Sequence, residues 1–74
     1  MTLDELKDKQ CCLVKKLSGD TTLKQRMMVL GIVPGVKIAL QKFAPLGDPI
    51  EIKLGEANLS LRKQEARAVQ VELV

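Results

Sequence analysis

The sequence predicts a mainly β domain with one inserted helix, in which five antiparallel strands form a small, partly open β-barrel. The 74 residues suffice for one domain, residues 1–74, with a single core. Apolar and polar residues alternate with period two through the second half, as in antiparallel strands with one solvated face. Five short strands in so small a chain cannot bury a flat sheet, so we expect the sheet to curl.

The first half carries the only helical pattern. Thr2 to Glu5 has the form of a capping box, which predicts one helical turn ending near Lys7. Residues 11–17 are predicted to form a strand with a bulge at residues 15–16, where the alternation breaks. A helix follows, capped by Asp20 or Thr22 and ending at Gly31, where a left-handed residue is expected.

The second half predicts four further strands, around residues 36–41, 50–54, 59–61 and 69–73. Turns are expected at residues 44–49 and 55–58, and a single helical turn at residues 63–66. The helix and strands together predict one apolar core: Leu23, Met27, Leu30, Ile38, Leu40, Ile50, Ile52, Leu59, Leu61, Val69 and Val71.

Composition excludes several classes of protein. Aromatic residues make up 1% of the chain, which argues against stacking platforms for single-stranded nucleic acid. The net charge of +3 is only a weak indication of an anionic partner. The longest nearly apolar run, residues 27–36, is about half of the ~20 residues that a membrane span needs. The N-terminus lacks the features of a signal peptide. We therefore expect a cytoplasmic protein without membrane insertion.

No catalytic, cofactor or metal site is predicted. The chain has no His, no nucleophile elbow, no Walker-type glycine loop and no paired carboxylates on one predicted face. Cys11 and Cys12 are adjacent on a predicted strand, so their side chains point to opposite faces and cannot comfortably bind one ion. We interpret them as structural residues. Asp48, Glu51 and Glu56 offer at most a weak surface site for a cation.

Two motifs resemble the ferrous-iron transport protein A family, FeoA: Gly31-Ile-Val-Pro-Gly35 and Ala44-Pro-Leu-Gly-Asp-Pro49. The resemblance extends over nearly the whole chain. Its motif positions, which we interpret as structural, are Arg26, Gly31, Pro34, Gly35, Pro45, Gly47, Pro49 and Arg62. The resemblance implies an SH3-like barrel and an accessory role in bacterial ferrous-iron uptake. It also implies a partner, the cytoplasmic GTP-binding domain of the membrane transporter FeoB.

Two surfaces are candidates for partner binding. Helical spacing places Met28 and Val29 away from the core, beside Lys24, and this helix face is the first candidate. The second is the loop containing Leu46 and Asp48. Asp48 is more readily interpreted as a turn residue that satisfies local backbone donors than as a contact for Arg62, Arg26 or a partner.

Arg26 lies about 60° from the core stripe of the helix, so its aliphatic stem is predicted to flank the core. Two functions stay open. One is a protein-interaction module of iron uptake. The alternative is a small basic barrel that binds nucleic acid, or a metal-responsive regulatory domain like the C-terminal domain of iron-dependent repressors. The sequence does not indicate the oligomeric state.

Overall fold

A computed structural model describes residues 1–74 and confirms a mainly β fold with one inserted helix. The chain forms, in order, the 3-10 turn η1 (Leu3–Glu5), strand β1 (Cys11–Leu17), helix α1 (Thr21–Val29), strands β2 (Lys37–Phe43), β3 (Ile50–Leu54) and β4 (Ala57–Leu61), the short helix α2 (Lys63–Ala66) and strand β5 (Val69–Leu73). No helix is long and apolar enough to cross a membrane.

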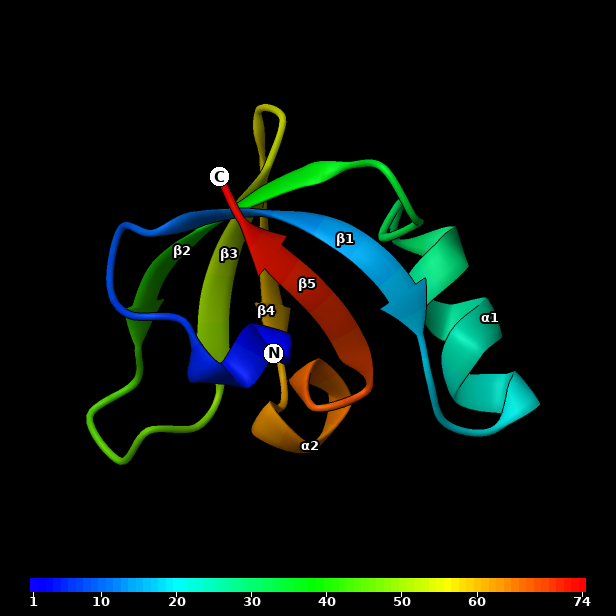
Figure 1. The fold of residues 1–74 in the computed structure, drawn as a ribbon. Coiled ribbons are helices and arrows are strands. Elements are labelled where there is room, and N and C mark those ends of the chain that lie inside the picture. Colours follow the sequence, from blue (N-terminus) through cyan, green and yellow to red (C-terminus); the bar gives the residue numbers. More distant parts are fainter.

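The five strands form one antiparallel sheet in the order β4-β3-β2-β1-β5. The sheet curls without closing, and α1 lies at the side of the molecule away from β2 (Figure 1). The predicted bulge in β1 is present between Val14 and Lys16, and a second register shift in β2 lies between Leu40 and Lys42. Bulges increase the local twist, which helps so short a sheet to curl around its core.

Local signals define both ends of α1. The Asp20 carboxylate caps the N-terminus by accepting a hydrogen bond of 2.8 Å from the Leu23 N–H. At the C-terminus, Gly31 has a φ of +91° and its N–H bonds to the Met28 carbonyl, while the N–H of Ile32 reaches the Met27 carbonyl. These two bonds form a Schellman motif, and they place Ile32 fully inside the core.

The buried core is wholly apolar and contains no aromatic side chain: Leu3, Leu6, Cys12, Val14, Met27, Ile32, Ile38, Leu40, Ile50, Ile52, Leu61, Ala66, Val69 and Val71. The predicted core was wrong at three positions. Leu23, Leu30 and Leu59 are half-buried at the margin of the core and are not fully enclosed in it. Met27 is the only fully buried residue of α1, and Leu23 and Leu30 beside it pack against the margin of the core.

Sequence periodicity missed six core residues: Leu3, Leu6, Cys12, Val14, Ile32 and Ala66. Several of them lie in η1, α2 and a helix-end turn, which are too short for a period to be visible. The expected first turn is also shorter than predicted, because η1 ends at Glu5. Strand β2 begins at Lys37, one residue later than expected, and β4 begins at Ala57, inside the segment predicted as a turn.

The N-terminus covers one edge of the sheet. The Met1 carbonyl accepts a hydrogen bond of 2.8 Å from the Val71 N–H, and Thr2 forms an isolated bridge with Gln70. The capping box is present, because the Thr2 N–H donates to Glu5 Oε1 at 2.7 Å. This hydrogen bond lowers the pKa of Glu5. The N-terminal turn therefore protects the edge of β5, whereas the edge strand β4 has no such cover.

We predict that Ile52→Ala and Leu61→Ala each lower the free energy of unfolding by about 2–5 kcal/mol, because each opens a cavity in a fully buried site. Urea denaturation followed by circular dichroism measures the loss. Leu46→Ala, at an almost fully exposed site, is the matched control and should change the free energy by less than about 0.5 kcal/mol. Equal losses at all three positions would contradict the core assignment.

Candidate functional site

The first candidate surface is the outer face of α1. Met28 is 56% exposed and Val29 is 87% exposed, and Lys24 lies one turn earlier, also exposed. Met27 faces the core and the Schellman motif fixes the end of the helix, so the directions of Met28 and Val29 follow from the fold. Two adjacent exposed apolar side chains beside a cation suit contact with another protein.

The second candidate surface is the loop between β2 and β3. The Ala44 N–H donates to the Pro49 carbonyl and the Gly47 N–H donates to the Ala44 carbonyl at 2.7 Å. Gly47 has a φ of +85°, which glycine adopts without a steric cost. At the tip of this hydrogen-bonded loop, Leu46 is 96% exposed.

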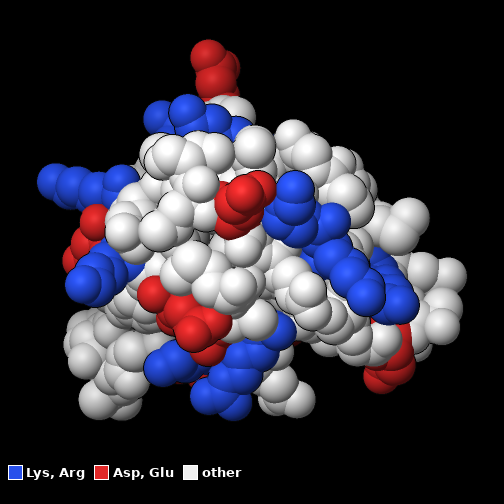
Figure 2. Space-filling model, in the orientation of Figure 1, with Lys and Arg blue, Asp and Glu red and all other residues white.

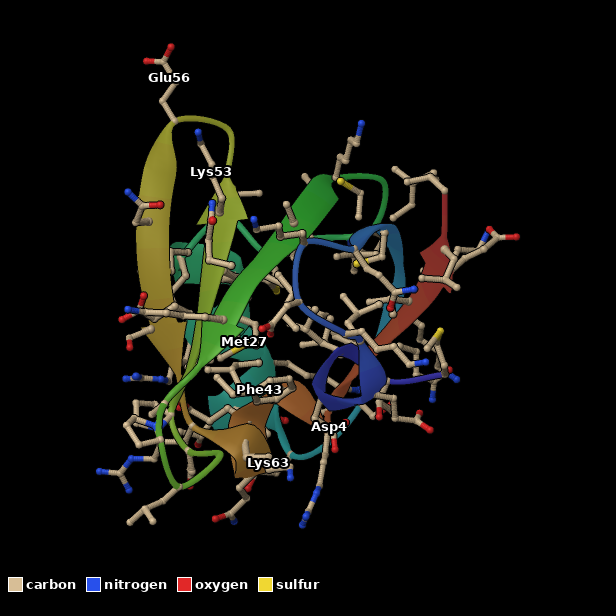
Figure 3. All side chains as sticks on the ribbon, turned by 90° about the vertical axis from the view of Figure 1, so that its left-hand side faces the viewer. Asp4, Met27, Phe43, Lys53, Glu56 and Lys63 are labelled. Atoms are coloured by element: carbon tan, nitrogen blue, oxygen red, sulfur yellow. The ribbon has the colours of Figure 1, made fainter.

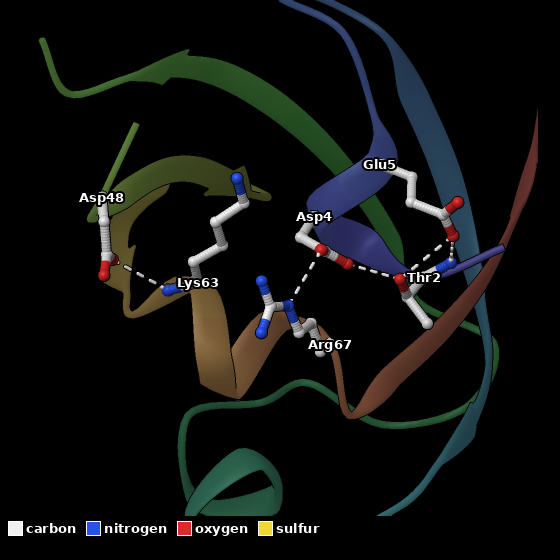
Figure 4. A network of polar contacts seen from close by, with 6 residues as sticks. All are labelled: Thr2, Asp4, Glu5, Asp48, Lys63 and Arg67. Atoms are coloured by element: carbon white, nitrogen blue, oxygen red, sulfur yellow. Dashed lines mark hydrogen bonds and ion pairs between the residues drawn. The ribbon is translucent and has the colours of Figure 1, made fainter. Parts of the chain in front are cut away.

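Asp48 does not satisfy a donor within its own turn, and this prediction was wrong. Its Oδ1 instead accepts a hydrogen bond of 2.9 Å from the backbone N–H of Lys63, at the first position of α2 (Figure 4). The first N–H groups of a helix have no partner within the helix, so this carboxylate supplies one from a distant loop. Asp48 therefore connects the 44–49 loop to α2, and the spacing of 15 residues hid this from the sequence.

The structure does not bring the two candidate surfaces together. The 44–49 loop and α1 lie at opposite sides of the molecule (Figure 1). Lys24, Met28 and Val29 can therefore form one contact surface, while Leu46 belongs to another. A single compact partner site containing all the candidate residues is excluded by this arrangement.

The glycines and prolines of the family motifs lie in turns. Gly35 has a φ of +95°, and its N–H donates to the Val14 carbonyl at 2.8 Å, so the turn at Pro34 and Gly35 is attached to β1. Pro45 and Pro49 lie on the loop that carries Leu46. Arg62 caps α2 through its backbone N–H, which donates to Glu65 Oε1 at 3.0 Å. These residues position the segments around them.

Helix α2 is the meeting point of three otherwise separate segments. Arg26 of α1 forms an ion pair with Glu65, with 2.6 Å between Nε and Oε2. Asp4 of η1 pairs with Arg67 just after α2, with 3.5 Å between Oδ2 and Nε, and Asp48 binds the Lys63 N–H (Figure 4). The Arg26 prediction was incomplete, because its guanidinium joins α1 to α2. Glu65 was missed as its partner.

A polar hollow lies beside this meeting point, between the start of α1 and α2. Its lining was not predicted and consists of Asp20, Thr22, Leu23, Arg26, Arg62, Gln64 and Glu65. The Arg26 guanidinium is paired with Glu65, whereas Arg62 is exposed and forms no ion pair. The hollow was invisible in the sequence, because its two walls are separated by more than thirty residues of chain.

Charges over the rest of the surface are mixed. Figure 2 shows basic side chains in several separate groups, each with acidic side chains near it. Lys15 pairs with Glu72 at 3.3 Å, and Lys42 lies 4.0 Å from Glu51 across the β2–β3 pair. Exposed pairs of this kind contribute at most about 1 kcal/mol each. This pattern differs from the one-sided basic patch that is typical of nucleic-acid-binding domains.

The two cysteines differ in burial. Cys12 is fully buried, and desolvation raises the pKa of its thiol, while Cys11 is half-buried on the neighbouring position of β1. A thiol with a raised pKa is a poor nucleophile and a poor metal ligand at neutral pH. The fold brings no three His, Cys, Asp or Glu side chains into an arrangement that could hold a metal ion.

We predict that Asp48→Ala lowers the free energy of unfolding by about 0.5–2 kcal/mol, the usual contribution of a helix-capping side chain. The measurement is urea denaturation, with amide hydrogen exchange at Lys63 as a local readout. Asp8→Ala, at an exposed aspartate without a hydrogen bond, is the control. Unchanged exchange at Lys63 would contradict the role of Asp48.

We predict that the isolated protein binds Fe(II) or Zn(II) only weakly, at a surface site. Calorimetric titration measures this binding. In a separate measurement, a thiol reagent should modify the half-buried Cys11 before the buried Cys12. Tight stoichiometric binding that disappears in a Cys11→Ser, Cys12→Ser double variant would refute this prediction.

Comparison with known proteins identifies the family. The FeoA domain family matches residues 1–73. The chain is 31% identical over 74 residues to a Fe(2+) transport protein A/Fe(2+) transporter FeoB fusion protein of Porphyromonas gingivalis, and it spans 9% of that protein. Iron(II) transport protein A from Clostridium thermocellum has a TM-score of 0.94 and 39% identity, covering 100% of this chain and 46% of that chain.

The fold is that of an SH3-like domain. FeoA of Stenotrophomonas maltophilia, determined in complex with zinc and described as a procaryotic SH3 domain protein, superposes with a TM-score of 0.85 and 28% identity. The match covers 97% of this chain and 89% of that one. Because the family matches almost the whole length of the chain, and the fold superposes on solved members, this chain belongs to the FeoA domain family.

Proposed function

We propose that this chain is a cytoplasmic accessory module of ferrous-iron uptake that acts by binding the cytoplasmic GTP-binding domain of a FeoB-like transporter. One observation carries the proposal: in the Porphyromonas gingivalis relative, transport protein A and the transporter FeoB form one fusion protein. Fusion raises the effective concentration of one binding module near another, so it favours pairs that act together.

The chemistry of the surface supports binding rather than catalysis. The chain has no His, and desolvation raises the pKa of the buried Cys12 thiol, which forms no hydrogen bond with another side chain. Cys12 therefore has neither a general base nor an orienting third group, which nucleophilic catalysis requires. The exposed apolar side chains, by contrast, are the features that protein contacts use.

We assign the contact to the outer face of α1. Met28 and Val29 offer apolar area at a helix end whose geometry the fold fixes, and Lys24 adds one positive charge. Such a surface suits a transient interface that buries less than about 1,200 Å². The 44–49 loop with Leu46 and Asp48 is the second choice, because only Leu46 is free there for an apolar contact.

Nucleic-acid binding is the alternative function. The net charge of +3 is its main support, while the mixed surface charge and the half-buried single aromatic Phe43 count against it. Retention on immobilised polynucleotide across a salt series discriminates the two. Nucleic-acid binding falls steeply with the logarithm of the salt concentration, whereas apolar docking to a protein does not.

We predict that Met28→Asp or Val29→Asp weakens binding to the FeoB cytoplasmic domain by about 2 kcal/mol or more, because each puts an unpaired charge into an apolar contact. Calorimetry with and without bound nucleotide measures the affinity, and cellular ferrous-iron uptake is the functional readout. Circular dichroism verifies folding.

Gln41→Asp is the matched control, since it adds the same charge at an exposed polar site of β2, a strand that lies away from α1 (Figure 1). It should bind almost normally. If a folded Met28→Asp, Val29→Asp double variant binds and supports uptake as the wild type does, α1 is not the docking face, and a Leu46→Asp variant then tests the 44–49 loop.

A further inference from the structure

The outer edge of β4 is the one unprotected edge of the sheet. Every backbone hydrogen bond of Ala57–Leu61 goes to β3, and none of its side chains takes part in a hydrogen bond or an ion pair. In an antiparallel pair, about half of the N–H and C=O groups of an edge strand point away from its neighbour. Those groups of β4 have no partner within the chain.

Strand β4 lacks the features that usually prevent an edge strand from pairing with another chain. Its sequence, Ala-Asn-Leu-Ser-Leu, has no charged residue, no proline and no bulge. At the opposite edge of the sheet, the main chain of Met1 and Thr2 covers β5. In Figure 3, β4 forms the margin of the sheet, and the Glu56 side chain at its start points away from the molecule.

The polar hollow lies at the far end of this edge. Arg62 follows directly after β4 and lines the hollow together with residues of α1, Leu23 and Arg26 among them. Two carboxylates also line the hollow. Glu65 pairs with Arg26, and Asp20 caps α1, so Arg62 is the cation there without an ion-pair partner. A strand edge that runs into a hollow with a free guanidinium combines backbone donors and acceptors with one positive anchor.

We propose that β4 is a docking edge for an extended peptide segment of another protein, which adds to the sheet as a sixth, antiparallel strand. The segment carries a carboxylate near its N-terminal end, where it passes Arg62. Backbone hydrogen bonds supply the affinity in this mode, and side chains beside the strand supply the selectivity. Antiparallel addition fits a sheet in which every pair is antiparallel. This surface is separate from Met28 and Val29.

The test uses end-blocked nine-residue peptides of alternating Thr and Val with one Glu at the N-terminal end, titrated into the ¹⁵N-labelled full chain. Saturable shifts of the amide signals of residues 57–62 are expected. Two further peptides carry N-methyl groups on the odd or the even residues. Strand addition requires that only one of these two loses binding, because only alternate N–H groups face β4.

Charge exchange tests the role of Arg62. Replacing the Glu of the peptide by Lys should weaken binding by about two- to fivefold, the effect of an exposed ion pair. Arg62→Glu should invert this preference, and Arg62→Gln should abolish it. Neither variant removes the backbone N–H with which Arg62 caps α2. The dispersion of the spectrum verifies that each variant is folded.

Three results would overturn the proposal: shifts confined to residues outside β4, equal binding of both N-methylated peptides, or a preference for Glu that persists in Arg62→Glu. The Met28→Asp, Val29→Asp variant should bind the peptide as the wild type does, and loss of binding there would place the peptide on α1. The same variant tests the two proposals independently, because it should lose binding to the FeoB cytoplasmic domain and keep binding to the peptide.

Discussion

The fold depends on the fact that five short strands curl into a sheet that does not close. An open curl leaves apolar side chains uncovered on one side, and α1 and Ile32 cover part of that opening, with Met27 as the only fully buried residue of α1. The core that results is aliphatic throughout, so its stability comes from close packing of small branched side chains. A domain of this size has little stability to spare, which explains why each buried Leu or Ile matters.

Polar contacts hold together surface segments that the apolar core does not fix. Three segments far apart in sequence converge on α2 and the residue that follows it. Helix α1 does so through Arg26 and the 44–49 loop through Asp48, while Asp4 of η1 pairs with Arg67 at the C-cap. The pairs are partly exposed, and exposed pairs contribute little stability. Their effect is mainly geometric, because they fix the positions of the loop that carries Leu46 and of the hollow beside Arg62. These contacts together orient the segments that meet around α2.

Two separate surfaces follow from this architecture. The apolar end of α1 suits contact with a folded partner, whereas the edge of β4 offers backbone groups to an extended segment. The proposed binding would be stabilised by burial of apolar area at α1 and by backbone hydrogen bonds at β4. The two proposed contacts therefore do not compete for the same residues.

The sequence by itself determined the strands, the helix, the turns and most of the core, because alternation, capping residues and glycine positions act over a few neighbouring residues. It also showed Met28 and Val29 to be outside the core stripe of α1. Only the tertiary structure decided that Asp48 binds Lys63, that Arg26 binds Glu65, and that the 44–49 loop lies far from α1. Each of these depends on how curled strands bring distant segments together, and no local pattern of residues records that distance.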